Sequence, residues 1–235
     1  MVGNGTRNDR LLWWLTVLCM ALMIAALYMA LIYAPAPANV ATEDQRFSQR
    51  IIYFHVPTAW IGFLAFLVTF VSSILYLARR ERRWDTVAAA SVELGVGFTT
   101  AVLITGSIWA KPAWNTWWTW DPRLTTSSIT WVIYLAYLML RAALDNSEQR
   151  ARLSAVYGIA GFSSVPITFM AIRWWRTIHP VLLDSSGFGL SPNMMTSFFL
   201  ALVAFTVLYI TLMWHRIRLQ QLSDEVQALR RRLLA

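Results

Sequence analysis

The chain has 235 residues, of which 57% are hydrophobic and only 14% are charged, and its formal net charge is +8. This balance lies far from that of a soluble globular domain. Apolar runs of about 20 residues, each long enough to cross a hydrocarbon core of roughly 30 Å, fill most of the length and leave no room for a separate soluble domain.

Continuous apolar runs predict membrane-spanning helices, because only helices and closed barrels pair every backbone polar group inside lipid. A barrel would show short alternating segments instead. The sequence therefore predicts an all-α integral membrane protein built as a six-transmembrane helical bundle. The expected spans are residues 11–34, 51–78, 86–110, 124–144, 153–172 and 192–214.

Two of these spans carry features of their own. The first could instead be a secretory signal, since Ala34-Pro35-Ala36 follows it, and cleavage there would leave five spans. Its apolar run is longer than that of an ordinary signal peptide, which favours a retained span. Pro166 lies inside the fifth span and is expected to kink that helix.

The arginine pattern predicts the orientation, because cytoplasmic loops carry an excess of basic residues. Arginines gather near both termini and in the connections at 79–83 and 141–152. Both termini are therefore expected in the cytoplasm. The loops at about 35–50, 111–123 and 173–191 are expected on the periplasmic side.

We expect a single six-span membrane domain over residues 1–215 and a cytoplasmic amphipathic helical tail over residues 216–235. One apolar stripe runs along the tail at spacings of four, three and four. Its members are Leu222, Val226, Leu229 and Leu233. Two interpretations stay open: a helix lying on the inner leaflet, or a contact with a cytoplasmic partner subunit.

Residues 109–125 form the most distinctive stretch, with five tryptophans, one aspartate and two cations between two apolar runs. Tryptophan also anchors proteins at membrane interfaces, so an anchoring belt is the alternative interpretation. If the segment is helical, Trp114, Trp117, Trp118 and Asp121 share one face. Such an amphipathic segment on the periplasmic side would be an aromatic platform for a large planar ligand with a charged edge, such as haem.

Of the three histidines, His55 and His179 fall on the outer side at the same membrane depth. Neutral imidazole is the usual axial ligand of haem iron. Two histidines on opposite faces of one porphyrin would give a low-spin b-type haem. The alternative for each is a histidine that is only hydrogen-bonded or solvated.

Haem propionates need cations or N–H donors when they leave bulk water. Arg123 follows the aromatic face directly and is the expected contact. Weaker candidates are Arg50, Lys111, Arg173 and Arg176. Asp121 is expected to orient Trp N–H groups, to pair with Arg123 or to begin the next helix. Glu93, inside the third span, is either functional or paired with a neighbouring helix.

The chain also lacks several motifs. It has no GxxxxGK[ST] and no GxGxxG after a strand, so ATP hydrolysis would belong to another subunit. Cys19 is the only cysteine, and without Cys-x-x-Cys-His the chain cannot carry covalent c-type haem itself.

Residues 114–125, Trp-Asn-Thr-Trp-Trp-Thr-Trp-Asp-Pro-Arg-Leu-Thr, resemble the WWD motif of the haem-handling proteins of cytochrome c maturation. His-Val-Pro at 55–57 and Trp-Trp-Arg-Thr-Ile-His at 174–179 resemble the two histidine segments of the CcmC family. The six spans and the short length also resemble that family. Asn115 stands where the family usually has glycine.

The resemblance implies a protein of the bacterial inner membrane that binds haem b transiently at its periplasmic face and presents it to the haem chaperone CcmE. It implies work with the small membrane protein CcmD, the ATPase CcmA and the membrane subunit CcmB. The chain itself is expected to be a haem-handling transport and assembly protein, with ATP hydrolysis by a partner subunit. His55 and His179 would be the iron ligands. The remaining implied site residues are Trp114, Trp117, Trp118, Trp120, Asp121 and Arg123.

Three other functions stay open. The first is a haem lyase component of the same superfamily, although those proteins are usually larger. The second is a permease subunit that uses the tryptophans only as an interfacial anchor. The third is an electron-transfer cytochrome b. Only the outer side offers a histidine pair, which argues against electron flow across the membrane.

Overall fold

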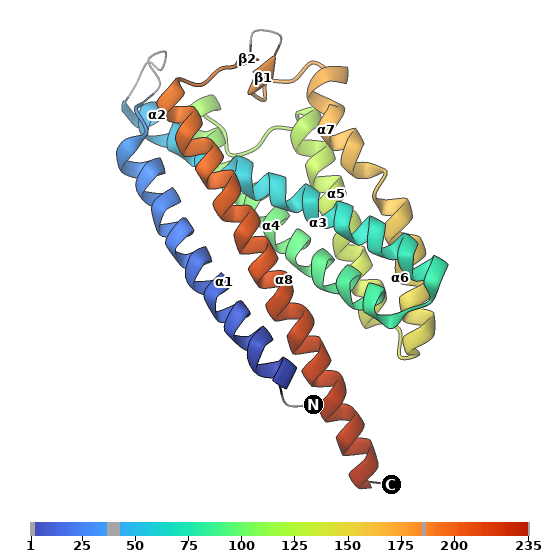
Figure 1. The fold of residues 1–235 in the computed structure, drawn as a ribbon. Coiled ribbons are helices and arrows are strands. Elements are labelled where there is room, and N and C mark those ends of the chain that lie inside the picture. Colours follow the sequence, from blue (N-terminus) through green and yellow to red (C-terminus); the bar gives the residue numbers. More distant parts are fainter. Residues whose placement is uncertain (1–2, 37–42, 185–186, 235) are drawn as a thin grey trace.

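The structure is a computed structural model that describes residues 3–36, 43–184 and 187–234 (Figure 1). Helices make up nearly all of it, and the predicted all-α membrane class is confirmed. The helices are α1 (Gly3–Tyr28), α2 (Glu43–Ser48), α3 (Ile52–Arg79), α4 (Arg82–Trp114), α5 (Pro122–Ala142), α6 (Ser147–Gly161), α7 (Ser164–Trp174) and α8 (Pro192–Leu234). A π-helical turn (Met29–Tyr33), a 3-10 turn (Gln49–Ile51) and a hairpin of β1 (Leu183–Asp184) and β2 (Gly187–Phe188) complete the elements.

Among the described residues, five helical stretches are long and apolar enough to cross a membrane. They are Arg7–Tyr33, Gln45–Arg79, Arg82–Trp114, Ser147–Trp174 and Pro192–Arg230. Each overlaps a predicted span, and the last one, Pro192–Arg230, continues well past the predicted end at residue 214. The remaining predicted span, 124–144, forms α5, which has 21 residues and packs against α4, α6 and α7 but is not among the five. The sixth span therefore stays a prediction.

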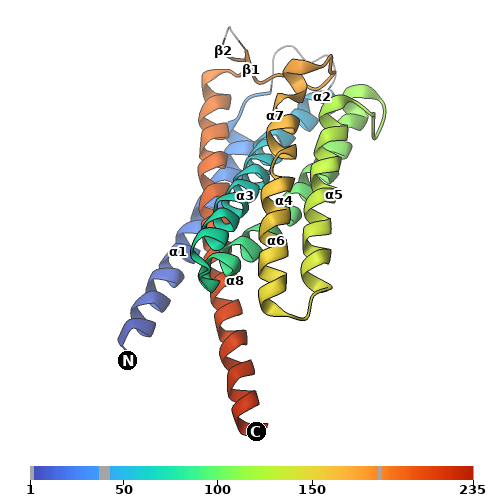
Figure 2. The ribbon, with the colours of Figure 1, turned by 90° about the vertical axis from the view of Figure 1, so that its right-hand side faces the viewer.

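The helices place the two chain ends at one end of the bundle and the hairpin at the other (Figure 1). α3 packs along α4, α1 packs along α8, and α5 lies beside α6 and α7 (Figure 2). The core cluster that joins α1 and the π-helical turn to α8 includes small side chains, which let helix backbones approach closely. These are Ala26, Ala30, Ala201 and Ala204.

Pro166 interrupts the stretch Ser147–Trp174, which is the fifth predicted span, as the sequence predicts. Proline has no N–H to donate, and its ring meets the carbonyl four residues earlier, which here belongs to Phe162. The helix breaks at that point, between Gly161 and Ser164, and the N–H of Val165 bonds to the Phe162 carbonyl at 3.0 Å instead. The result is two helices, α6 and α7, within one stretch.

The shared face predicted for Trp114, Trp117, Trp118 and Asp121 requires a continuous helix, and the tryptophan-rich segment does not form one. α4 ends at Trp114, and residues 115–121 have no regular secondary structure. Asn115 adopts the left-handed conformation (φ 57°, ψ 20°), which terminates helices and which Asn tolerates better than most residues. Asp121 then caps α5, and Pro122 occupies its first turn. The expectation that Asp121 begins a helix is confirmed.

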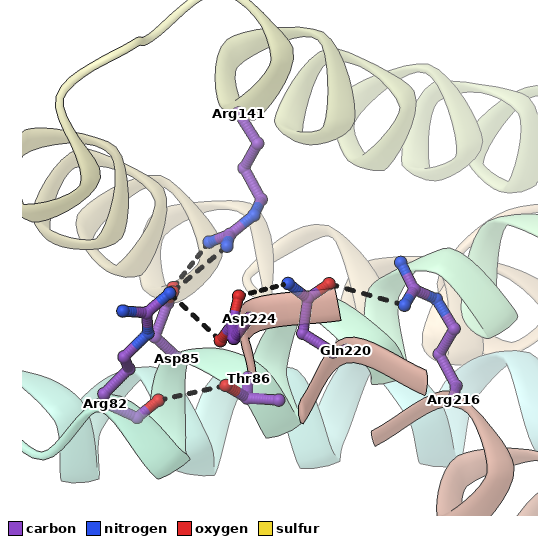
Figure 3. A network of polar contacts seen from close by, with 7 residues as sticks. All are labelled: Arg82, Asp85, Thr86, Arg141, Arg216, Gln220 and Asp224. Atoms are coloured by element: carbon purple, nitrogen blue, oxygen red, sulfur yellow. Dashed lines mark hydrogen bonds and ion pairs between the residues drawn. The ribbon is translucent and has the colours of Figure 1, made fainter. Parts of the chain in front are cut away.

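At the opposite end, ion pairs join α8 and α5 to α4 (Figure 3). Asp224 pairs with Arg82 at 3.1 Å, and Asp85 pairs with Arg141 at 2.5 Å. Gln220 bridges Asp224 and Arg216 along α8. Arg216 also binds Glu93 through two hydrogen bonds of 2.5 and 2.8 Å, so Glu93 has the neighbouring-helix partner that one interpretation expected.

α8 runs without a break past residue 215, and its last turns extend beyond the rest of the bundle (Figures 1 and 2). The predicted apolar stripe of the tail is exposed along this extension, with exposed fractions from 50% at Leu222 to 85% at Leu233. The backbone therefore has no hinge at the predicted division between domain and tail.

Candidate ligand-binding site

A cavity of about 540 Å³ lies at the end of the bundle opposite the chain ends. Its volume falls within the usual range of roughly 300–1,000 Å³ for small-molecule and cofactor sites. α3, α4, α5 and α7 wall it, together with the segment that leads from α7 to α8. Both predicted histidines, His55 and His179, line it.

His55 belongs to the first turn of α3 and contacts α4. Its Nδ1 lies 2.9 Å from the hydroxyl oxygen of Thr105. The imidazole also lies directly against Gly106, where a Cβ added to the glycine would come within 3.1 Å of the ring carbon Cε1. Glycine at this position therefore permits the close approach of the ring to the helix backbone.

His179 lies in the segment after α7. Its Nδ1 is 3.1 Å from the carbonyl oxygen of Pro180, and because a carbonyl only accepts, Nδ1 must carry the proton. Burial and then the positive charge of Arg123 lower the pKa of His179, against the opposing effects of the Pro180 carbonyl and Asp121. The imidazole is therefore neutral at neutral pH, with a lone pair on Nε2.

Asp121 ties the tryptophan loop to the histidine loop. Its Oδ1 accepts from the Thr177 hydroxyl at 2.7 Å and from the Arg123 N–H at 2.9 Å, and its Oδ2 accepts from the Ile178 N–H at 2.9 Å. Burial alone would raise the pKa of Asp121, but these hydrogen bonds outweigh it and lower the pKa. The partners of this carboxylate among the described residues are thus not Trp N–H groups.

Arg123 brings a cation into the cavity wall. Its guanidinium donates to the Thr168 carbonyl and lies 5.5 Å from the ring centre of Phe63. Arg173 lines the cavity as well. Two other predicted cations have partners elsewhere: Lys111 holds the carbonyl and side chain of Asn115, and Arg50 donates to the Ala30 carbonyl. Arg176 is not among the lining residues.

The tryptophans divide into two groups. Trp109, Trp114 and Trp118 line the cavity, and the rings of Trp109 and Trp114 meet edge to face with centres 5.0 Å apart. Trp117 and Trp120 lie outside the lining, with 59% and 79% of their surface exposed. The structure therefore brings part of the predicted platform to the histidines and leaves the other part at the surface.

A family model described as CcmC, Heme exporter protein C, matches residues 5–232 of the chain. The chain belongs to the Heme exporter protein C family. It is 31% identical to a Heme exporter protein C from Bradyrhizobium diazoefficiens, over 97% of this chain and 87% of that protein. It is 29% identical to one from Rhodobacter capsulatus, over 78% and 82%. A ccmC-like mitochondrial protein of cytochrome c biosynthesis from Marchantia polymorpha is 31% identical over 80% and 78%.

In this member of the Heme exporter protein C family, sequence reasoning missed Thr105, Gly106 and Thr177. Thr177 lies two residues before His179, so its position next to a predicted ligand was a usable signal. Thr105 and Gly106 lie about 50 residues from His55 in sequence, and only the packing of α4 on α3 brings them to the imidazole. Trp109 belongs to the segment singled out but not to the predicted site.

Proposed function

We propose that this protein binds haem b in the cavity, with His55 and His179 as the two iron ligands. The observation that carries the proposal concerns the ring nitrogens. Each Nδ1 is hydrogen-bonded, to Thr105 or to the Pro180 carbonyl, and neither Nε2 has a hydrogen-bond partner among the described residues. Metal-bound histidines have this arrangement, because the second nitrogen is held by an outer partner.

The rest of the lining supports a large, planar, partly charged ligand. Trp114 and Trp118 offer flat apolar faces, and Arg123 and Arg173 offer cations that can hold propionates. Trp117 and Trp120, exposed beside the cavity, would extend the platform toward the surface. Asp121 keeps the loop that bears His179 in position through Thr177 and Ile178.

We place the cavity on the periplasmic face of the bacterial inner membrane and both chain ends in the cytoplasm. The arginine-rich connections support this orientation. The protein would present its haem cargo there to the chaperone CcmE for cytochrome c maturation. The names of the relatives, which are heme exporters and a cytochrome c biosynthesis protein, support that role.

CcmD, CcmB and the ATPase CcmA are the proposed partners. Because the sequence carries no nucleotide-binding motif, ATP hydrolysis is assigned to a partner. The exposed apolar stripe of α8, at the end of the bundle away from the cavity, offers a surface for such a subunit.

One observation favours a second candidate, a permease subunit with tryptophan anchors. Trp117 and Trp120 expose most of their surface, as interfacial anchors do. That candidate gives no role to the paired histidines, and it predicts a protein that takes up no haem.

The test is the optical spectrum of the purified protein supplied with haem, recorded oxidised and reduced. We expect a low-spin spectrum with two imidazole ligands, which both His55→Ala and His179→Ala alter. The matched control is His215→Ala, because His215 contacts Thr16 on α1 and does not line the cavity. A colourless wild-type protein, or unchanged spectra in both cavity variants, would overturn the proposal.

A further inference from the structure

We propose that Thr105 is a positioning residue that fixes the tautomer of His55, so that the imidazole keeps its proton on Nδ1 and its lone pair on Nε2. The inference deepens the proposed function, since it rests on His55 being a haem ligand. Nothing in the motif or the two histidine segments points to Thr105, which lies in the middle of the apolar stretch of α4.

The hydroxyl proton of Thr105 is already committed. Its oxygen lies 2.7 Å from the carbonyl oxygen of Ala101 and 3.3 Å from that of Val102, one turn earlier on the same helix. A carbonyl oxygen only accepts, and a hydroxyl has a single proton. The proton therefore lies on the carbonyl side, and the oxygen presents a lone pair to its other neighbour.

That neighbour is Nδ1 of His55, 2.9 Å away. Because the Thr105 oxygen accepts there, Nδ1 must be the donor. In the opposite tautomer Nδ1 is an acceptor, so the Thr105 hydroxyl would have to donate its proton to Nδ1. The Thr105 and Ala101 oxygens would then lie 2.7 Å apart with no proton between them. Two acceptors at that distance repel each other, so the hydroxyl selects one tautomer.

The same turn of α4 also fixes the position of the ring. Gly106 follows Thr105 directly, and its backbone lies against the imidazole. The ring is thus held by one hydrogen bond and one close contact from two adjacent residues. A prearranged ligand loses less conformational freedom on binding, and an accepted Nδ1 proton makes Nε2 a stronger donor to iron.

The two histidines differ in how this is achieved. His179 donates to the main-chain carbonyl of Pro180, which no side-chain substitution removes. The Nδ1 proton of His55 is accepted by a side chain, that of Thr105. One substitution at Thr105 can therefore change the donor strength of His55 without changing that of His179. Thr105→Val removes the hydroxyl at nearly constant shape, and Thr105→Ser keeps it.

The experiment measures the tautomer and the haem site separately. In the haem-free protein with ¹⁵N-labelled histidine, we expect His55 as the Nδ1–H form in wild type and Thr105→Ser, and a shift toward Nε2–H in Thr105→Val. With haem supplied, we expect Thr105→Val to bind about 10- to 100-fold more weakly. Its iron should also have a higher reduction potential, because a weaker donor stabilises the ferric state less.

Ser107→Ala is the matched control, since the only partner of the Ser107 hydroxyl among the described residues is the Leu103 carbonyl of its own helix, at 2.9 Å. It should leave the tautomer, the affinity and the potential unchanged. The inference is overturned if wild-type His55 is the Nε2–H form, or if Thr105→Val behaves as wild type. It is also overturned if Ser107→Ala reproduces the change.

Failure of the proposed function looks different from failure of this inference. A wild-type protein that takes up no haem would remove the haem assignment, while the nitrogen spectra of the haem-free protein would still decide the tautomer. A haem-loaded wild type with an unaltered Thr105→Val variant would leave the function intact and remove the role of Thr105.

Discussion

The carboxylate of Asp121 accepts a 2.7 Å hydrogen bond from the hydroxyl of Thr177, and this contact joins the loop before α5 to the loop after α7. The N–H of Ile178 binds the second oxygen of the same carboxylate at 2.9 Å. Because the Thr177 oxygen in turn accepts the N–H of His179 at 3.0 Å, the histidine is located through Asp121 without touching it.

The first prediction concerns Asp121→Asn. An amide offers one acceptor oxygen instead of two, so its NH2 group must face either the Ile178 N–H or the Thr177 and Arg123 donors, which then lose their acceptor. We expect a loss of about 2 kcal/mol in the free energy of unfolding, typical of a hydrogen bond to a charged group. We also expect haem binding about 10-fold weaker or worse, as for other outer partners of metal ligands. Thermal unfolding and haem titration measure the two effects.

Asp9→Asn is the control for that substitution. Asp9 pairs with Arg218 at the other end of the bundle, and both side chains are partly exposed. Exposed pairs contribute no more than about 1 kcal/mol. Equal losses of haem affinity in the two variants would contradict the positioning role of Asp121.

The second prediction is that Asp121 and Thr177 act as one unit. We compare the haem dissociation constants of Asp121→Asn, Thr177→Val and the double variant. Residues in direct contact couple by about 0.5–3 kcal/mol, so the double variant should lose less than the two single losses together. Strictly additive losses would mean that the hydrogen bond between the two residues does not hold the histidine loop.

Much of the fold could be predicted because it follows from local pattern. Apolar runs of membrane length located five helical stretches, and Pro166 located the break between α6 and α7. α5 is harder to identify as a span from hydropathy, since its first half is rich in Ser and Thr. The Thr126, Ser127 and Ser128 hydroxyls bond back to carbonyls of the same helix, a compensation that hydropathy does not register.

Site residues could be predicted where the chemistry depends on the type of side chain. They could not be predicted where their role depends on the packing of one helix against another. His55, His179 and Arg123 were predicted from their side chains, and all three line one cavity. The prediction of a shared tryptophan face was wrong because it requires a helix that continues past Asn115, and Asn115 adopts the left-handed conformation. Thr105 could not be predicted, because its partner belongs to another helix.

The third prediction tests that left-handed residue. Most side chains cost about 1–2 kcal/mol in this conformation, and glycine does not. Asn115→Val should therefore destabilise the protein by about that amount and weaken haem binding, because the turn directs Trp114 and Trp118. Asn115→Gly should retain both properties, although it loses the side-chain contact with Lys111 and keeps only the one to the carbonyl.

Arg80 provides the comparison, since it has the same backbone conformation (φ 58°) at the opposite end of the bundle. Arg80→Gly should raise the unfolding temperature without changing haem affinity. If Asn115→Val binds haem as tightly as wild type, the turn does not shape the cavity.

The last prediction uses two glycines of α4. A Cβ on Gly106 would lie 3.1 Å from the His55 ring, whereas a Cβ on Gly97 would meet no atom of the described residues within 4 Å. Replacing a helical glycine with alanine stabilises by roughly 0.5–1 kcal/mol where there is space. Gly97→Ala should therefore raise the unfolding temperature and leave haem binding alone. Gly106→Ala gains the same helix preference but pushes the imidazole away from its position beside Thr105. We expect its haem affinity to fall while its unfolding temperature changes little, and identical affinities in the two variants would show that the ring does not need its contact with α4.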